Sequence, residues 1–100
     1  MSEFTLRTSN TATQTTVASS ASSVSLIAAN PQRRGLCIQN TSTAILYVLL
    51  VGNVSTATAT TAHTVQIPAN GYWEVPYGFT GAVAGIWASA NGQANMTEMT

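Results

Sequence analysis

The sequence predicts an all-β protein, a single antiparallel β-sandwich or small jelly-roll-like barrel of about seven to eight strands with an extended N-terminal arm. Three observations predict this class. Short segments that alternate apolar and polar residues, or are apolar throughout, recur along the chain. Turn-forming Asn, Gly and Pro residues separate them at intervals of about eight to twelve residues. No segment repeats apolar residues at the spacing of a helix.

The beginning of the chain predicts an arm. Residues 8–23 are nearly all Ser, Thr, Ala, Gln and Asn, so they bury too little apolar surface to offset the entropy lost on ordering. We expect one edge strand here, around residues 15–17, and a short strand at the tip, where Phe4 and Leu6 alternate with polar neighbours. The expected division is an arm over residues 1–22 and a β-sandwich domain over residues 23–100.

Seven further segments predict strands. Residues 45–51 are apolar on both faces and rich in strand formers, so they should form a central strand, covered by the second sheet on one side and by a partner or a loop on the other. Gly85 indicates a bulge or a close backbone approach. Asn91-Gly92 is the clearest hairpin turn in the chain. The predicted strands are residues 24–28, 34–40, 45–51, 63–67, 72–75, 82–88 and 93–99.

The chain is poor in charge. Only 6% of its residues are charged, and the formal net charge is zero, whereas about a quarter of the residues of a typical soluble protein are charged. Three arginines and no lysine are too few for nucleic-acid binding or for attachment to an anionic membrane. Because net charge keeps proteins apart, this composition favours a protein that spends its life assembled, although the abundant Ser, Thr, Ala and Asn could also keep a monomer soluble.

No targeting segment is apparent. Residues 1–20 are polar and lack the basic start and apolar run of a signal peptide. The longest apolar stretch, residues 44–51, is too short to span a bilayer. We therefore expect the protein to be made and to mature in the cytoplasm.

The residues needed for catalysis or metal binding are scarce, so we expect no enzymatic activity, no metal and no cofactor. A nucleophilic triad needs an acid beside His63, yet the chain has no Asp and its glutamates lie in separate segments. A zinc site needs three or four ligands. We expect His63 to be a strand-edge residue bonded to backbone rather than a pH switch. Cys37 is expected to be a small buried hydrophobe.

Two adjacent arginines are candidates for partner binding. Arg33 and Arg34 follow a turn and begin a predicted strand. In one interpretation they pair within the chain with Glu74 or Glu98. In the other they anchor the protein to an acidic patch on a partner, where the planar guanidinium is favoured. The residues alone leave both interpretations open.

An aromatic cluster supplies further candidates. Trp73 is expected in the core, whereas Tyr72, Tyr77 and Phe79 lie on the opposite face or in a loop. Exposed aromatic residues of this kind are enriched at protein interfaces. They can also stack on sugar rings, which favours glycan binding as an alternative.

From residue 30 to the end, about 70% of the chain resembles a small β-sandwich domain that recurs in the virions and prophages of tailed bacteriophages. The resemblance implies a structural role in the virion. An arm followed by one domain fits a stand-alone decoration protein better than a tail module. The stretches that carry the resemblance are residues 30–36 (Asn-Pro-Gln-Arg-Arg-Gly-Leu), 39–47, 68–76 (Pro-Ala-Asn-Gly-Tyr-Trp-Glu-Val-Pro), 81–83, 85–88 and 96–98.

The leading hypothesis is a capsid decoration, or cement, protein on the capsid exterior, with the major capsid protein as its partner. In this hypothesis the protein is a homo-oligomer, and we expect a trimer. A receptor- or glycan-binding module of a phage head or tail fibre is the alternative, and a scaffolding or host-interacting protein is a third reading. The candidate interface residues are Phe4, Leu6, Arg7, Arg33, Arg34, Tyr72, Tyr77 and Phe79.

Overall fold

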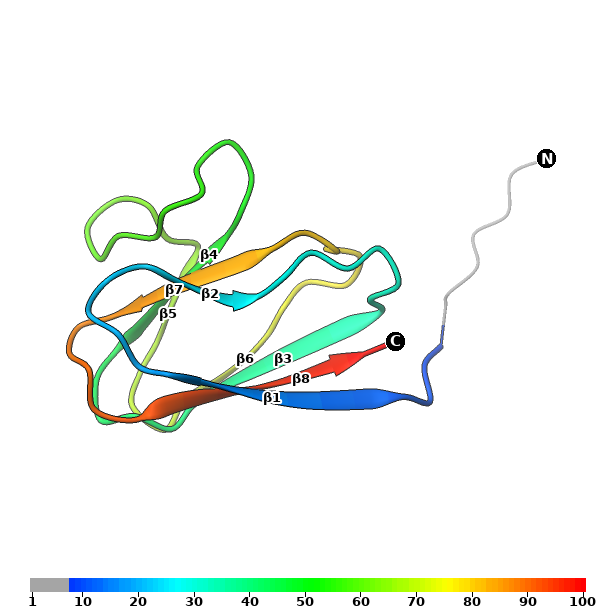
Figure 1. Cartoon of the computed structure of the whole chain (residues 1–100), viewed down its shortest axis with the longest axis horizontal. Coiled ribbons are helices and arrows are strands. Elements are labelled where there is room, and N and C mark those ends of the chain that lie inside the picture. Colours follow the sequence, from blue (N-terminus) through cyan, green and yellow to red (C-terminus); the bar gives the residue numbers. More distant parts are fainter. Residues whose placement is uncertain (1–7) are drawn as a thin grey trace.

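The computed structural model describes residues 8–100, and every regular element in this range is a β-strand (Figure 1). The candidate residues Phe4, Leu6 and Arg7 lie outside the described residues. The strands are β1 (Ala12–Ala18), β2 (Val24–Ile27), β3 (Gly35–Asn40), β4 (Leu46–Leu50), β5 (Val65–Ile67), β6 (Tyr72–Glu74), β7 (Val83–Trp87) and β8 (Gln93–Met99).

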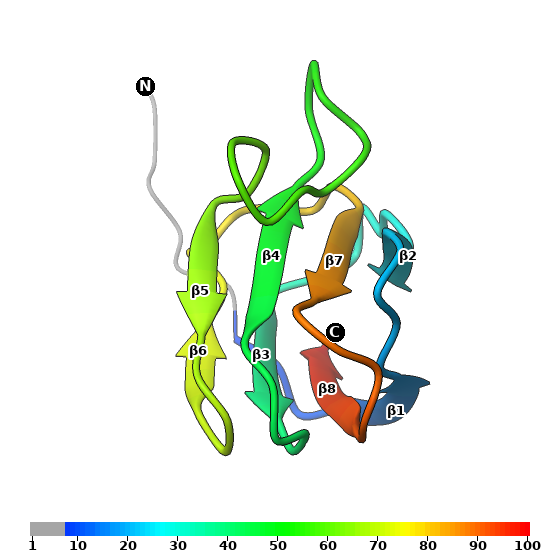
Figure 2. The ribbon, with the colours of Figure 1, turned by 90° about the vertical axis from the view of Figure 1, so that its left-hand side faces the viewer.

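The strands form two antiparallel sheets that pack face to face (Figure 2). Sheet I has the strand order β1-β8-β3-β6, and sheet II has the order β2-β7-β4-β5. The first strand therefore pairs with the last, the second with the seventh, the third with the sixth and the fourth with the fifth. This nested pairing in two four-stranded sheets is the arrangement of a jelly roll. The predicted antiparallel sandwich is confirmed.

The connections cross between the sheets, and only the β4–β5 connection joins neighbours of one sheet. The prediction of a hairpin at Asn91-Gly92 is therefore wrong, because β7 belongs to sheet II and β8 to sheet I. The glycine is needed for another reason. Gly92 has a φ of +148°, and a Cβ atom there would lie 2.5 Å from the Cα of Ser42. The turn before β8 packs directly on the turn after β3.

The core lies between the sheets and follows from the alternation of each strand. In β3, Leu36 and Ile38 point inward, while Cys37 and Gln39 point outward. Burial of each large apolar side chain contributes about 1.5–3 kcal/mol. Trp73 is half-buried and packs against this core. The buried core residues are Leu26, Leu36, Ile38, Ala44, Leu46, Val48, Ile67, Val75, Val83, Trp87, Ala94 and Met96.

Strand β4 is central in sheet II, between β7 and β5, and apolar on both faces, as predicted. Leu46 and Val48 point into the core. Leu49 points outward and is buried with Ala57 and Ala84. Ala57 belongs to the long β4–β5 loop, so the chain's own loop covers this apolar face, as Figure 2 shows above β4.

Gly85 in β7 marks a close approach. A Cβ atom at this position would lie 2.9 Å from Cδ1 of Leu26 and 3.0 Å from Cδ1 of Leu46. The neighbouring strand β2 also shifts register between Ser25 and Ile27. The glycine therefore leaves room for two core leucines beside an irregular strand, in agreement with the sequence prediction.

The expected arm contributes a full strand to the sandwich. β1 is an edge strand of sheet I and pairs with β8 along its whole length, from Ala12 opposite Met99 to Ala18 opposite Gln93. It contains the edge strand expected at residues 15–17 and extends it in both directions. The packed unit thus includes residues 12–18, ahead of the expected boundary at residue 23.

Candidate functional site

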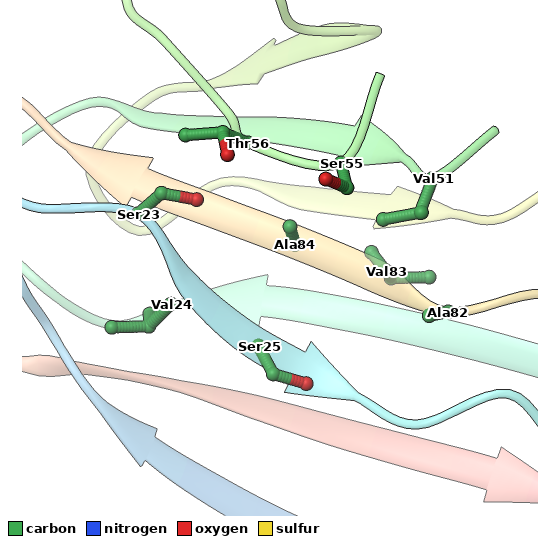
Figure 3. Close-up of a pocket in the computed structure, with 9 residues that line it drawn as sticks. All are labelled: Ser23, Val24, Ser25, Val51, Ser55, Thr56, Ala82, Val83 and Ala84. Atoms are coloured by element: carbon green, nitrogen blue, oxygen red, sulfur yellow. The ribbon is translucent and has the colours of Figure 1, made fainter. Parts of the chain in front are cut away.

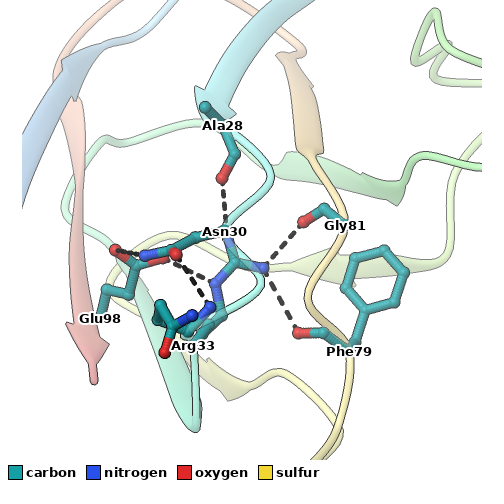
Figure 4. Close-up of polar contacts among 7 residues, drawn as sticks. Ala28, Asn30, Arg33, Phe79, Gly81 and Glu98 are labelled. Carbon is teal, nitrogen blue, oxygen red and sulfur yellow. Dashed lines mark hydrogen bonds and ion pairs between the residues drawn. The ribbon is translucent and has the colours of Figure 1, made fainter.

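Arg33 lies inside the fold (Figure 4). Its side chain is 1% exposed, and its Nε donates to Oε2 of Glu98 at 2.7 Å. The remaining nitrogens donate to the carbonyl oxygens of Ala28 at 2.7 Å and Gly81 at 2.8 Å, with a longer contact to that of Phe79. The intramolecular pair with Glu98 is confirmed, and the interpretation of Arg33 as a partner anchor is wrong. All three nitrogens of its guanidinium already donate to acceptors, which come from three separate segments of the chain.

Phe79 is also part of the packed structure. Its side chain is half-buried and packs against the core cluster. Its ring fills the space above Gly81, where a Cβ atom would lie 2.7 Å from the ring. Phe79 does lie in a loop, as the sequence predicts, but this loop places its ring against the core cluster and Gly81. Little of the ring remains for a partner.

Three other candidates do come together. Arg34, Tyr72 and Tyr77 line one pocket of about 350 Å³ at the outer side of β3 and β6. Tyr72 and Tyr77 are 58% and 55% exposed, so their rings are accessible. The other residues lining the pocket are Gly35, Leu36, Cys37, Glu74, Val75 and Met99.

Tyr72 lies in a small polar cluster on this surface. Its hydroxyl donates to Oε2 of Glu74 at 3.0 Å. Hydrogen bonding with Cys37 and then with Glu74 raises the pKa of Tyr72 to about 12. A phenol with this pKa stays protonated throughout the neutral range and acts as a hydrogen-bond donor. The Tyr72 proton therefore stays in the hydrogen bond to Glu74 in this pH range.

Arg34 has donor capacity left over. One terminal nitrogen donates to the carbonyl oxygen of Thr8. Its Nε is buried but finds no acceptor among residues 8–100. An unpaired buried donor is costly, and because Nε has almost no accessible surface, a ligand could supply its acceptor only if the Arg34 side chain moved. Arg34, unlike Arg33, therefore remains a candidate for binding.

The pocket belongs to a larger surface, the outward face of sheet I, which we call the open face. None of its residues is buried, so no described segment covers it. Glu74 is the one charged residue among these strand positions, all within the described range. The open face consists of Ala12, Gln14, Thr16 and Ala18 of β1, Gln93, Asn95, Thr97 and Met99 of β8, Gly35, Cys37 and Gln39 of β3, and Tyr72 and Glu74 of β6.

A second pocket, of about 380 Å³, lies on the outer side of sheet II beside the β4–β5 loop (Figure 3). Its lining includes no titratable side chain, so it offers neither an acid nor a base. The polar side-chain groups that line this pocket are the Ser and Thr hydroxyl groups drawn in Figure 3. The lining residues are Ser23, Val24, Ser25, Val51, Ser55, Thr56, Ala82, Val83 and Ala84.

The isolated titratable residues are placed as follows. Nδ1 of His63 lies 3.1 Å from the carbonyl oxygen of Thr58, and its ring packs on Tyr47 with centroids 5.0 Å apart. The expected backbone contact of His63 is confirmed. Cys37 is half-buried on the open face, so the prediction of a buried hydrophobe is wrong. Within residues 8–100 no three His, Cys, Asp or Glu side chains gather as metal ligands.

The described part of the chain contains no helix long and apolar enough to cross a membrane. No family model, curated protein or solved structure matches the chain. Its function is therefore argued from the surfaces described above.

A buried polar network at the end of β3 was not predicted from the sequence. Asn40 is fully buried, and its amide nitrogen donates to three carbonyl oxygens, those of Ala44, Ile67 and Pro68. Its amide oxygen accepts from the Ser42 hydroxyl at 2.7 Å and from the Trp87 indole at 3.1 Å. In the sequence, Asn40 and Ser42 look like part of an ordinary polar turn. Their partners from other segments come together only because the chain crosses between the two sheets.

Proposed function

We propose that the protein is a bacteriophage capsid decoration, or cement, protein that binds the exterior of the assembled head and bridges capsid subunits. The observation that carries the proposal is the open face of sheet I. It is uncovered and almost free of charge, and the accessible rings of Tyr72 and Tyr77 lie at its edge. The resemblance of residues 30–100 to virion domains supports the same role.

The contrast between the two sheets supports a protein-binding face. The chain covers the apolar outer side of sheet II with its own loop, where Leu49 and Ala57 are buried. The open face has no such cover within the described chain. Interface centres are depleted in charge and enriched in tyrosine and arginine, which matches the combination of Tyr72, Tyr77 and Arg34 here. A jelly roll by itself does not decide the function, since both viral capsid and lectin domains use it.

The proposed action is a linkage effect. A protein that binds the assembled shell and not its separated subunits stabilises the shell by the free energy of that binding. The partner is the major capsid protein, and the chain is expected to sit where capsid subunits meet. The low charge argues against roles for nucleic acid or membrane and, with so few titratable groups, against catalysis.

The test compares phage shells with and without the purified chain during disruption by heat or a chelator. The wild-type chain should raise the disruption temperature. Gln39→Glu, which places a charge in the middle of the open face beside Tyr72, should weaken the effect. The matched control is Gln66→Glu, an exposed residue of β5 in sheet II. Equal shell stability with and without the wild-type chain would contradict the proposal.

The pocket at Tyr72 and Tyr77 favours a second candidate, a receptor- or glycan-binding module of a head or tail fibre. Two accessible aromatic rings, the Glu74 side chain and the Arg34 side chain line this pocket of about 350 Å³. This combination offers stacking surfaces and hydrogen-bonding groups for a sugar. A glycan array probed with the chain tests this candidate. Binding that is lost in Tyr77→Ala would support it, and an array without binding would remove it.

A further inference from the structure

Among residues 8–100 no strand pairs with the outer edge of β1, and this edge lacks the features by which proteins usually protect a sheet edge. β1 and β8 are each seven residues long, the longest strands described. β1 (Ala-Thr-Gln-Thr-Thr-Val-Ala) contains neither a charged residue nor proline. Its pairing with β8 runs without a register shift, so no bulge twists the edge away. Short strands, lysines, prolines and bulges are the common protections.

The backbone groups that point away from β8 can be assigned. The N–H of Thr100 donates to the carbonyl of Thr11, and the N–H of Ser19 donates to the carbonyl of Gly92. In an antiparallel ladder the residues bonded to one neighbour alternate with those facing the other side. The odd-numbered residues of β1 therefore bond to β8. The N–H and C=O groups that face outward belong to Ala12, Gln14, Thr16 and Ala18.

We infer that this edge is a self-association site, where β1 of a second copy adds antiparallel to β1 and joins two copies of sheet I into one continuous sheet. A two-fold axis at Thr15 places Gln14 opposite Thr16 of the second copy and Ala12 opposite Ala18. Every outward-facing backbone group of the strand then meets its counterpart.

The strand itself favours a second copy as the occupant. In the two-fold register Thr15 lies opposite its own copy and Thr13 lies opposite Val17, and neither pair opposes like charges. The chain has zero net charge, so two copies do not repel one another. Thr13 and Thr15 are exposed on the core side of sheet I, beyond the cover of sheet II, so they are free to pair. This inference does not depend on the proposed capsid role.

A disulfide trap tests the register. Thr15 and its copy form a non-hydrogen-bonded pair with Cα atoms about 4.5 Å apart, which suits a disulfide. Thr15→Cys, made together with Cys37→Ser, should give a covalent dimer on mild oxidation. The matched control is Thr13→Cys in the same background, because Thr13 and its copy lie about 14 Å apart in this register. Failure of Thr15→Cys to cross-link, or equal cross-linking of both variants, would overturn the inference.

Sedimentation velocity over a hundredfold range of concentration tests association directly. The wild-type chain should move towards twice the monomer mass, and Thr16→Pro should remain monomeric. The N–H of Thr16 points away from β8, so proline removes no backbone hydrogen bond inside the molecule and only the side-chain bond from the Thr16 hydroxyl to Oδ1 of Asn95. Thr16→Lys is a second disrupting variant, with Gln66→Lys on the edge strand of sheet II as its control. A monomer at every concentration, or an assembly unchanged by both Thr16 variants, would refute self-pairing through β1.

Discussion

Replacement of Arg33 by methionine should destabilise the fold more than a surface substitution does. Arg33 is 4% exposed, and the side chain of its partner Glu98 is only 13% exposed. Arg33→Met leaves a largely buried carboxylate without its cation and three carbonyl oxygens without their donor. Removal of one partner from a buried ion pair costs about 3–5 kcal/mol. A domain of this size has a total stability of about 5–15 kcal/mol, so the variant should be marginally stable.

Urea unfolding followed by the fluorescence of the buried Trp87 measures the effect. With a slope of about 1.5 kcal/mol per molar, the loss should lower the midpoint by about 2–3 M. The double variant Arg33→Met with Glu98→Leu removes the unpaired charge and should recover part of the loss, which defines a double-mutant cycle. A loss below about 1 kcal/mol for Arg33→Met would refute the reasoning, because exposed pairs behave in that way.

Two further predictions concern the turn before β8 and the polar cluster on the open face. Gly92→Ala should lower the free energy of unfolding by about 1–3 kcal/mol in the same urea assay, because Gly92 has a positive φ and contacts the turn after β3. Gly52 has open space around it, so the control Gly52→Ala should change this free energy by less than about 0.5 kcal/mol. In an ultraviolet titration of tyrosinate, the pKa of Tyr72, about 12 in the wild type, should fall towards its ordinary value of 10.0 in Cys37→Ala and by less in Glu74→Gln. Since folding raises this pKa, the associated stabilisation is complete below pH 10 and is lost as the pH rises towards 12. If the pKa of Tyr72 were unchanged in both variants, the hydrogen bonds with Cys37 and Glu74 would not be the cause of its raised value.

The strands could be predicted because the signal for a half-buried strand is local. Leu36 and Ile38 alternate with Cys37 and Gln39, and this period of two specifies both the strand and the face that each residue occupies. The two-sided apolar run at residues 45–51 likewise predicted a central strand. In both cases the information lies within a few neighbouring residues.

The positions of the strands in the two sheets could not be predicted in the same way. Asn91-Gly92 has the composition of a hairpin turn, yet its glycine serves a contact with Ser42, far away in the sequence. Arg33 and Arg34 are adjacent and chemically identical. The antiparallel pairing of β3 with β8 brings Glu98 to the first arginine, and the second lies at the pocket. Such differences depend on long-range pairing, which no local pattern encodes.

The same limit applies to the candidate site. Tyr72 and Tyr77 were predicted to be exposed from their positions on the outer face and in a loop, and both are. Their convergence with Arg34 depends on the antiparallel pairing of β3 with β6. The open face itself could not be foreseen, because no local pattern reveals that, within residues 8–100, the outer side of sheet II is covered by a loop and the outer side of sheet I is not.

The most direct test of the central claim is a binding titration of the purified chain onto assembled phage shells that lack it, with the bound copies counted by quantitative mass spectrometry. The account predicts saturable binding at a fixed ratio to the major capsid protein, weakened by Gln39→Glu and unaffected by Gln66→Glu. Absence of saturable binding, together with absence of the chain from virions assembled from the genome that encodes it, would contradict the account.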